Sequence, residues 1–273
     1  MHAIQEQDAP DQLPLVSVIV PARNMSRYLP AAIAKDPRVH CHHTLSGGMS
    51  AARNLGIRAS RGSVIALCDA DDWWAPNTLS LQLRCLREDP DVGVVCTGFT
   101  VVSEPGQPLR WFHPMPRDGW ITEALFLSNV VSGSTSIIRR RHLDMVGLCD
   151  ESLALAEDYD LWLRLSTCCA FRFLNGATYF YRQWWGQSTR NEIALVESTI
   201  SVRRNFLLKH PLLVCRAVQQ EAWSRLLVER GLAKMRAGRG RCVAIADIAR
   251  GLRFQPGYVK GWRAIAKVLI GRV

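Results

Sequence analysis

The sequence predicts an α/β protein, with a mostly parallel β-sheet between helices and a helical extension after it. Short apolar runs rich in β-branched residues, such as Leu15–Val20 and Ser63–Cys68, alternate with segments that have helical periodicity. Strands that alternate with helices are typical of a parallel sheet covered on both faces. From Glu192 onward the pattern is helical. We therefore expect three parts: a disordered tail over residues 1–13, an α/β domain over residues 14–191 and a basic helical extension over residues 192–273.

Most of the strands are predicted from an apolar run that ends at a turn-forming or charged residue, and residues 38–44 are a further possible strand. The first run ends at Pro21, which cannot donate to a sheet, and the run at residues 63–68 ends at the acidic segment Asp69–Asp72. Four prolines between residues 105 and 118 predict a loop there. The strands are expected at residues 15–20, 38–44, 63–68, 92–102, 133–138 and 171–181.

Helices are predicted where apolar residues recur every three or four positions. In residues 49–59, for example, Ala51, Leu55 and Ala59 lie on one side. Proline or glycine near positions 211, 238–240 and 256–257 divides the extension into four helices. The helices are expected at residues 27–34, 49–59, 76–88, 121–127, 140–146, 158–168, 197–210, 213–237, 241–254 and 258–270.

Composition places the chain among ordinary globular proteins. Of its 273 residues 48% are hydrophobic and 21% are charged, which excludes a wholly disordered chain, collagen and a disulfide-stabilised miniprotein. No run reaches the ~20 apolar residues that span a bilayer, and the polar, acidic residues 1–14 are unlike a secretory signal. Nine cysteines without a Cys-x-x-Cys pair predict buried thiols in a reducing compartment, and zinc-ligand spacings are absent. We therefore expect a cytoplasmic protein.

The net charge of +10 is concentrated in the helical extension. Residues 192–273 hold 16 of the 34 basic side chains and 5 of the 24 acidic ones. Such a segment suits phosphate-bearing partners, although a solvated arginine-rich helical face explains it equally well. The last expected helix, residues 258–270, is basic and amphipathic, which suits an anionic membrane surface; the alternative is a helical hairpin packed on the rest of the chain. No recognition-helix signature is present, so we expect no nucleic-acid partner.

A strand that ends in three carboxylates is the strongest local signal for chemistry. Residues 65–72 read Ile-Ala-Leu-Cys-Asp-Ala-Asp-Asp, and in open parallel sheets ligands bind at the carboxyl ends of the strands. Clustered carboxylates repel one another unless a cation lies between them, which favours Mg²⁺ or Mn²⁺ bound to a diphosphate. The alternative is that Asp71 or Asp72 only caps the helix that begins near Pro76.

Two further segments place polar groups at helix starts. Glu157 and Asp158 begin an expected helix, where the dipole stabilises a carboxylate that can act as a general base; a plain helix cap is the alternative. Gly47 and Gly48 precede another helix, whose free N–H groups suit an anion, and Arg53 on that helix can pair with a phosphate.

Together and in this order, these segments resemble family 2 glycosyltransferases of the GT-A fold, which are inverting, metal-dependent enzymes that use nucleotide sugars. The resemblance covers residues 14–191 and implies a Rossmann-like, mostly parallel sheet flanked by helices. The matching segments are Val16–Asn24, Gly47–Gly56, Ala66–Trp74, Gly147–Leu153, Glu157–Arg164 and Tyr181–Arg182.

The resemblance also implies a role for each matched residue. Asp71 would coordinate Mg²⁺ or Mn²⁺ on the donor diphosphate, and Asp158 would take the proton from the acceptor hydroxyl, with Glu157 beside it. The remaining roles concern the nucleotide: Asp69 would approach the ribose, Arg53 would lie near the nucleotide, and Pro21, Ala22, Arg23 and Asn24 would line the base pocket.

The chain departs from the family pattern at two places. Family members have further residues after the first helix, which form a second strand and an Asp-Asp-Gly-Ser-like loop that holds the nucleotide base. Here residues 29–39 run straight through without that loop. In addition, Trp184 stands where members often carry a histidine.

The resemblance thus implies an inverting glycosyltransferase of polysaccharide biosynthesis. It would move a sugar from a nucleoside-diphosphate sugar, with UDP as the nucleotide, to a glycan or lipid-linked acceptor. It would lie on the inner face of the membrane through residues 258–273. The alternative is a non-catalytic GT-A remnant that acts as a scaffold or partner-binding module, because the base-binding loop is missing.

Overall fold

The computed structural model describes residues 14–23, 37–44, 47–112, 118–184 and 191–271. Asn24, the expected tail over residues 1–13 and the expected helix over residues 27–34 lie outside the described residues. The division expected at residue 191 stays a prediction. The chain forms two compact units, each described here by itself: the first is Met1–Gly119 with Ser132–Leu148 and Cys168–Arg182, and the second is Trp120–Val131 with Cys149–Thr167 and Gln183–Val273.

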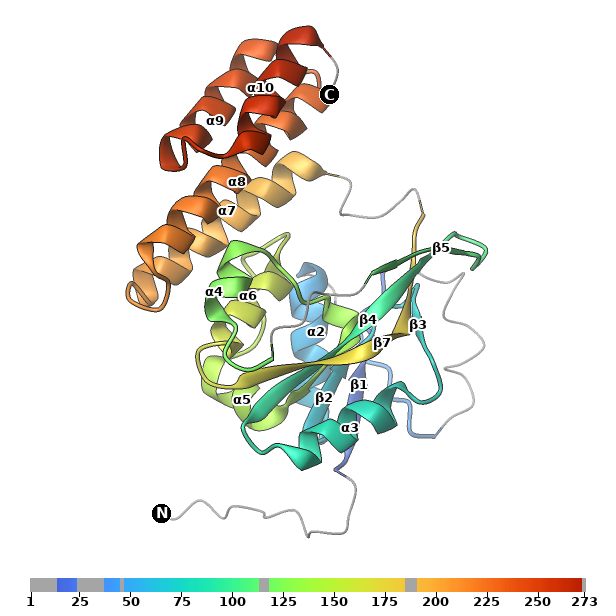
Figure 1. The fold of residues 1–273 in the computed structure, drawn as a ribbon. Coiled ribbons are helices and arrows are strands. Elements are labelled where there is room, and N and C mark those ends of the chain that lie inside the picture. Colours follow the sequence, from blue (N-terminus) through green and yellow to red (C-terminus); the bar gives the residue numbers. More distant parts are fainter. Residues whose placement is uncertain (1–13, 24–36, 45–46, 113–117, 185–190, 272–273) are drawn as a thin grey trace. The chain divides into compact units, whose positions relative to one another are not determined.

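The first unit is built on one sheet (Figure 1). Its strands are β1 (Val16–Ile19), β2 (Val64–Leu67), β3 (Trp73–Trp74), β4 (Val92–Val102), β5 (Pro108–Phe112), β6 (Ser136–Arg139) and β7 (Ala170–Arg182). They lie in the order β1-β2-β6-β4-β7-β3, with β5 paired to β4. β1, β2, β4 and β7 run in one direction, because β1–β2 and β4–β7 are parallel pairs and β6 is antiparallel to both β2 and β4. The predicted α/β fold with a mostly parallel sheet is confirmed.

Helices pack on both faces of this sheet, and alternate residues of each strand face them. These helices are α2 (Gly48–Ala59), α3 (Thr78–Glu88) and α5 (Arg140–Val146), and a 3₁₀ turn, η1 (Gly133–Thr135), precedes β6. On one face Val64 and Ala66 of β2 pack with Leu83 and Leu86 of α3. Elsewhere α2 approaches β1 so closely that a Cβ at Gly56 would lie 2.7 Å from the Cγ2 atom of Ile19.

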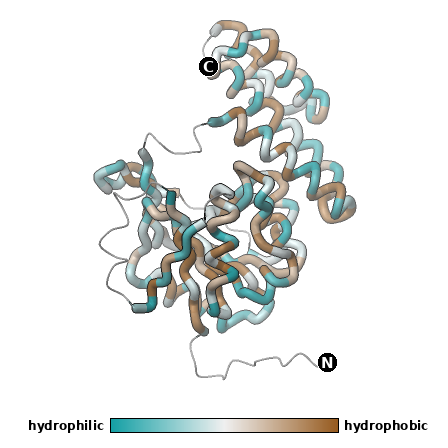
Figure 2. Tube along the Cα trace, turned by 180° about the vertical axis from the view of Figure 1, so that it is seen from behind, coloured by the Kyte–Doolittle hydropathy of each residue, from teal (hydrophilic) through white to brown (hydrophobic). Residues whose placement is uncertain are grey.

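The second unit is helical. Its helices are α4 (Thr122–Leu127), α6 (Glu157–Leu165), α7 (Glu192–Lys209), α8 (Arg216–Arg236), α9 (Arg241–Phe254) and α10 (Val259–Ile270). Val228, Ile248, Leu252 and Val268 form the core that joins α8, α9 and α10. Hydrophobic residues recur along these helices in alternation with hydrophilic ones (Figure 2). Within the described part of the chain, no helix is both long and apolar enough to cross a membrane.

The structure differs from the expected elements in several places. Residues 38–44 form no strand and are exposed, because Val39 is their only aliphatic residue and they have no apolar face to bury. The expected loop at residues 105–118 contains β5, which pairs with β4 and begins at Pro108, a position where proline costs the ladder little. Finally, Trp73 and Trp74 form a short strand, β3, that the sequence pattern did not predict.

Candidate functional site

The acidic segment follows β2 directly, at the edge of the sheet where β1 also ends. β1 and β2 are parallel in register, with Ile19 opposite Leu67, and the backbone N–H of Cys68 continues the ladder to the carbonyl of Ile19 at 3.0 Å. The segment that includes the buried Pro21 and the exposed Ala22 and Arg23 therefore leaves the sheet at the same edge as the acidic segment. This juxtaposition is the one predicted for a nucleotide site.

Asp69 is held by an arginine from α2. A guanidinium nitrogen of Arg53 lies 3.2 Å from Oδ1 of Asp69, and the Arg53 side chain is 5% exposed whereas that of Asp69 is 31% exposed. The backbone N–H of Asp69 donates to Oγ of Ser134 at 3.0 Å. The structure thus brings together two residues, Arg53 and Asp69, that were predicted separately as nucleotide contacts.

Asp72 is tied to the end of β7. Its carboxyl group accepts hydrogen bonds from the hydroxyl of Tyr179 and, at 2.7 Å, from the backbone N–H of Arg182. Burial raises the pKa of Asp72 to about 8, and repulsion from Asp71 and Asp69 adds to this, while the Arg182 N–H opposes it. Asp72 is therefore a positioning residue for the acidic turn, a role that needs the register of β7 and that sequence spacing did not reveal.

Arg182 holds the same turn from its other side. Its Nε donates to the backbone carbonyl of Asp71 at 2.8 Å, and its guanidinium lies 4.8 Å from the ring centroid of Trp73. The Trp73 ring in turn stacks on Phe180 at 5.2 Å. The matched Tyr181–Arg182 segment thus has a physical function, because it fixes where the carboxylates point.

The alternative interpretation of these acids as helix caps is wrong. The N-cap of α3 is Asn77, so neither Asp71 nor Asp72 caps that helix. Cys68 beside them is no nucleophile, because burial, with added repulsion from the acids, raises the pKa of its thiol to about 12.

The residues at this edge fit a hard divalent cation. The donor set is made of carboxylate oxygens, which Mg²⁺ and Mn²⁺ prefer. Burial is the main cause of the raised pKa of Asp72, and repulsion from Asp71 and Asp69 adds to it. A bound cation relieves such repulsion. Asp71 is half-buried and ends the Asp-x-Asp spacing that was predicted for the metal.

Glu157 and Asp158 belong to the second unit, where both are half-buried in the first turn of α6. The helix is preceded by Ala156, which has a φ of 60° and is the N-cap, so neither acid is the capping residue itself. The Asp158 carboxylate accepts the backbone N–H of Tyr159 at 2.7 Å. Asp158 also lines a cavity of about 140 Å³ together with Asn129 and Thr199.

A left-handed alanine is unusual for an L-residue and costs about 1–2 kcal/mol. Among the residues that the structure describes, Ala156 is the only non-glycine residue with positive φ. Such strain recurs at functional sites, and here it sets the direction in which α6 begins. This local feature marks the Asp158 region independently of its charge.

The chain matches the family model described as "Glycosyltransferase like family 2" over residues 23–186. An uncharacterized glycosyltransferase of Rickettsia typhi is 25% identical in an alignment of 233 positions that covers 72% of each chain. A Rickettsia felis relative is 24% identical over 208 residues, but the chain spans only 35% of its length.

The fold is shared with solved glycosyltransferase structures. S. aureus TarS 1–349 has a TM-score of 0.55 at 16% identity, with 94% of this chain and 91% of that chain covered. The mannosyltransferase PcManGT from Pyrobaculum calidifontis has a TM-score of 0.53 at 16% identity, with 96% and 81% covered. These likenesses confirm the predicted GT-A fold. Because the family model matches residues 23–186, more than half of this chain, the chain belongs to the glycosyltransferase family 2 group.

Proposed function

We propose that the protein transfers a sugar from a nucleoside-diphosphate sugar, with UDP as the nucleotide, to a hydroxyl of a glycan or lipid-linked acceptor. The observation that carries the proposal is the cluster of three aspartates after β2, which is held by Arg53 and by the end of β7. Two related folds support it by what was bound to them: TarS was solved with UDP-GlcNAc, and PcManGT with GDP-Man and Mn²⁺.

The residues of the first unit would bind the donor. When bound at Asp71, Mg²⁺ or Mn²⁺ neutralises negative charge on the leaving diphosphate. Arg53 holds Oδ1 of Asp69, and the other carboxylate oxygen would accept a hydrogen bond from a ribose hydroxyl. Pro21, Ala22, Arg23 and Asn24 would line the base.

Asp158 would act as the general base. Its position in the first turn of α6 suits a negatively charged side chain, because the helix dipole and the Tyr159 N–H both favour negative charge there. An ionised carboxylate accepts the proton of the acceptor hydroxyl as that oxygen attacks the anomeric carbon, which inverts the centre without a covalent intermediate. Glu157, its half-buried neighbour, would support the same negative region.

The proposal is tested by measuring nucleoside diphosphate released from a panel of UDP- and GDP-linked sugars, with Mn²⁺ and after chelation. We expect release from UDP sugars with Mn²⁺ and its loss on chelation. Equal release with and without the chelator contradicts the metal assignment, and release from GDP sugars alone contradicts the choice of UDP.

A second candidate, a non-catalytic GT-A module, is favoured by one observation. In the described part of the chain β1 lies at the end of the sheet, and residues 38–44 add no strand beside it. That is the arrangement left when the second family strand is missing. A folded protein that binds neither UDP nor GDP would support this candidate.

We also propose that α10 contacts an anionic membrane surface. Gly261, Ala264 and Val268 face the helical core, whereas an apolar stripe remains exposed on the other side. This stripe is bordered by basic residues at positions 260, 263 and 267, as in interfacial helices. Its exposed fractions are 58% for Val259, 56% for Trp262, 57% for Leu269 and 66% for Ile270.

Co-sedimentation with vesicles of phosphatidylserine or of phosphatidylcholine tests this contact. We expect binding to the anionic vesicles that weakens with salt, since the basic charges are screened. Ile270→Asp should reduce it, whereas Leu212→Asp, at a residue 94% exposed between α7 and α8, should not. Equal loss in both variants contradicts a role for α10.

A further inference from the structure

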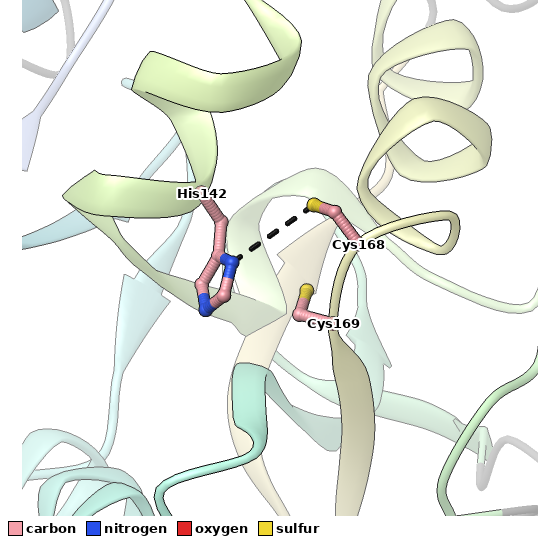
Figure 3. A group of neighbouring side chains, drawn as sticks. All are labelled: His142, Cys168 and Cys169. Carbon is pink, nitrogen blue, oxygen red and sulfur yellow. Dashed lines mark hydrogen bonds between the residues drawn. The ribbon is translucent and has the colours of Figure 1, made fainter.

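Three soft ligand side chains meet at a point that the proposed sugar-transfer site does not use (Figure 3). His142 lies in the first turn of α5, and Cys168 and Cys169 lie in the turn just before β7. One ligand atom from each lies within 4.8 Å of the other two, and Nδ1 of His142 is 3.9 Å from Sγ of Cys168. His142 is 7% exposed, Cys169 is 1% exposed and Cys168 is half-buried.

The sheet topology explains why these residues meet. β6 and β7 flank β4, with β6 antiparallel to it and β7 parallel to it. The end of β6 and the beginning of β7 therefore both lie beside the beginning of β4. α5 follows β6 and the two cysteines precede β7, so the three side chains converge over the first residues of β4.

A glycine in β4 leaves room for the cluster. A Cβ at Gly93 would overlap Sγ of Cys169 and lie 2.6 Å from Cδ2 of His142. The backbone of Gly93 also hydrogen-bonds the Cys169 thiol. Any larger residue at position 93 would push Cys169 and His142 away. The glycine therefore lets both side chains lie against β4.

We propose that His142, Cys168 and Cys169 bind one Zn²⁺ ion, through Nδ1 and the two sulfur atoms. Zinc takes nitrogen and sulfur ligands in tetrahedral sites, at about 2.0–2.1 Å for nitrogen and about 2.3 Å for sulfur. Those lengths place ligand atoms roughly 3.5–3.8 Å apart. The 3.9 Å separation of His142 and Cys168 is already close to this, and the third ligand needs a shift of at most about 1 Å.

Charge balance favours a divalent ion such as zinc over a monovalent soft ion here. Binding releases one proton from each thiol, and two thiolates with a neutral imidazole cancel the charge of Zn²⁺. A monovalent ion would leave a net charge in a largely buried place, which costs free energy. Cys168 is half-buried, so a water molecule from solvent would be the fourth ligand.

One contact must change when the ion binds. Nε of Arg141 lies 3.3 Å from Nε2 of His142 and donates to it, so Nδ1 carries the imidazole proton in the metal-free protein. With zinc on Nδ1, the proton moves to Nε2 and the Arg141 contact is released. Arg141 keeps its hydrogen bond to the carbonyl of Pro90, at 2.7 Å on the surface.

The site would join α5 to the start of β7 across β4. It is chemically distinct from the carboxylates at the end of β2. Sulfur ligands select zinc over Mg²⁺, whereas carboxylate oxygens suit Mg²⁺ or Mn²⁺. Its consequence is stability rather than catalysis: an ion that binds only the folded state raises the unfolding temperature with its concentration.

Metal analysis after chelation, reconstitution with zinc and dialysis, in the presence of a phosphine reductant, tests the proposal. We expect about one zinc per chain in the wild type and in Cys242→Ser, whose cysteine is exposed on α9. Loss of an outer-shell partner weakens metal binding by about 10–100-fold. Cys168→Ser removes a ligand itself, so it should weaken zinc binding by more than this. Cys168 is chosen for substitution because it is half-buried, so its replacement disturbs the core least. Circular dichroism checks the fold of the variant.

Cobalt substitution of the wild type decides the matter even if a variant fails to fold. A thiolate-to-cobalt charge-transfer band with intense visible bands indicates a tetrahedral sulfur site. The proposal is overturned if the wild type keeps no zinc, if Cys168→Ser keeps as much as Cys242→Ser, or if cobalt shows no thiolate band.

Discussion

The three aspartates that follow β2 have different environments, and this sets what each substitution should do. Asp69 is paired with Arg53, and Asp72 accepts hydrogen bonds from Tyr179 and from the backbone of Arg182. The turn that carries Asp71 is held through its backbone carbonyl. We therefore expect Asp71 substitutions to act on the metal and Asp72 substitutions to act on the shape of the turn.

Asp158→Asn should slow transfer strongly and spare donor binding. An amide cannot accept the acceptor proton, so we expect turnover to fall by about 10²–10⁴-fold. The matched control is Asp160→Asn on the same helix, whose carboxylate pairs with Arg164 at 2.8 Å. Turnover of nucleotide sugar, together with calorimetric binding of UDP, separates the two effects. Loss of UDP binding in Asp158→Asn, or equal loss of turnover in both variants, would mean that the role of Asp158 is structural.

At the scale of elements, a buried arginine joins the helices around α6. Arg203 of α7 is 4% exposed and donates to the Tyr159 hydroxyl at 3.0 Å, to the carbonyl of Ala222 at 3.0 Å and to that of Leu127 at 3.1 Å. The Tyr159 hydroxyl in turn donates to the carbonyl of Leu125 at 3.0 Å. This network connects α4, α6, α7 and α8 by neutral acceptors around one cation.

Tyr159→Phe should destabilise the helical unit by about 1–3 kcal/mol, because it leaves a buried guanidinium N–H and a buried carbonyl without their partner. Urea denaturation followed by helical circular dichroism measures this. Tyr258→Phe is the control, since that ring is only half-buried between α9 and α10. An unchanged midpoint for Tyr159→Phe contradicts the network.

A buried carboxylate joins α8 to α9. Asp247 is 3% exposed, and its oxygens lie 2.7 Å from Nη2 of Arg230 and 2.8 Å from Nζ of Lys234. Burial alone would raise the pKa of Asp247, but the hydrogen bonds from Lys234 and Arg230 hold it below its usual range. Because the folded pKa is lowered, the stabilisation is present above the unfolded value of about 3.9 and is lost as the pH falls through the folded pKa.

Asp247→Asn should therefore destabilise the helical unit by about 2 kcal/mol at neutral pH, less than for a fully buried pair because both cations reach solvent. The gap between wild type and variant should shrink as the pH is lowered below about 4. Urea denaturation at neutral and acid pH measures the gap. A gap that is the same at both pH values contradicts this role of Asp247.

At the scale of the whole molecule, much of the fold was predictable from local patterns. The buried strand β2 is an uninterrupted apolar run, β4 is mostly apolar although glycine and threonine interrupt it, and the four helices after Glu192 are separated by proline or glycine. The errors had two different causes. Residues 38–44 looked extended but have no apolar face, and β5 forms because β4 offers it an edge.

The candidate site was predictable to the same degree. Asp69 and Asp71 end a strand, which is a local signal, and Arg53 follows a glycine pair. The support from Tyr179 and Arg182 depends on where β7 lies against β4, more than 100 residues along the chain from Asp72. The His142–Cys168–Cys169 cluster likewise has no spacing signal, because the sheet order brings its parts together.

The excess positive charge after residue 191 is in part structural. Arg203 is buried, Arg230 and Lys234 bind Asp247, and Arg236 pairs with Glu192 at 2.6 Å. The charge that faces a partner is thus smaller than the sum suggests. The basic residues of α10 border its exposed apolar stripe, so the membrane contact is argued from that helix and not from net charge.

Calorimetric titration of UDP, with and without Mn²⁺, tests the central claim most directly. We predict saturable binding with Mn²⁺ that weakens at least about tenfold, or about 1.4 kcal/mol, without the ion and in Asp71→Asn. The control is Asp144→Asn, at an exposed acid of α5, which should bind as the wild type does. If the folded wild type binds no UDP, or binds it equally with and without Mn²⁺ and Asp71, the account of this site as a metal-assisted donor site is contradicted.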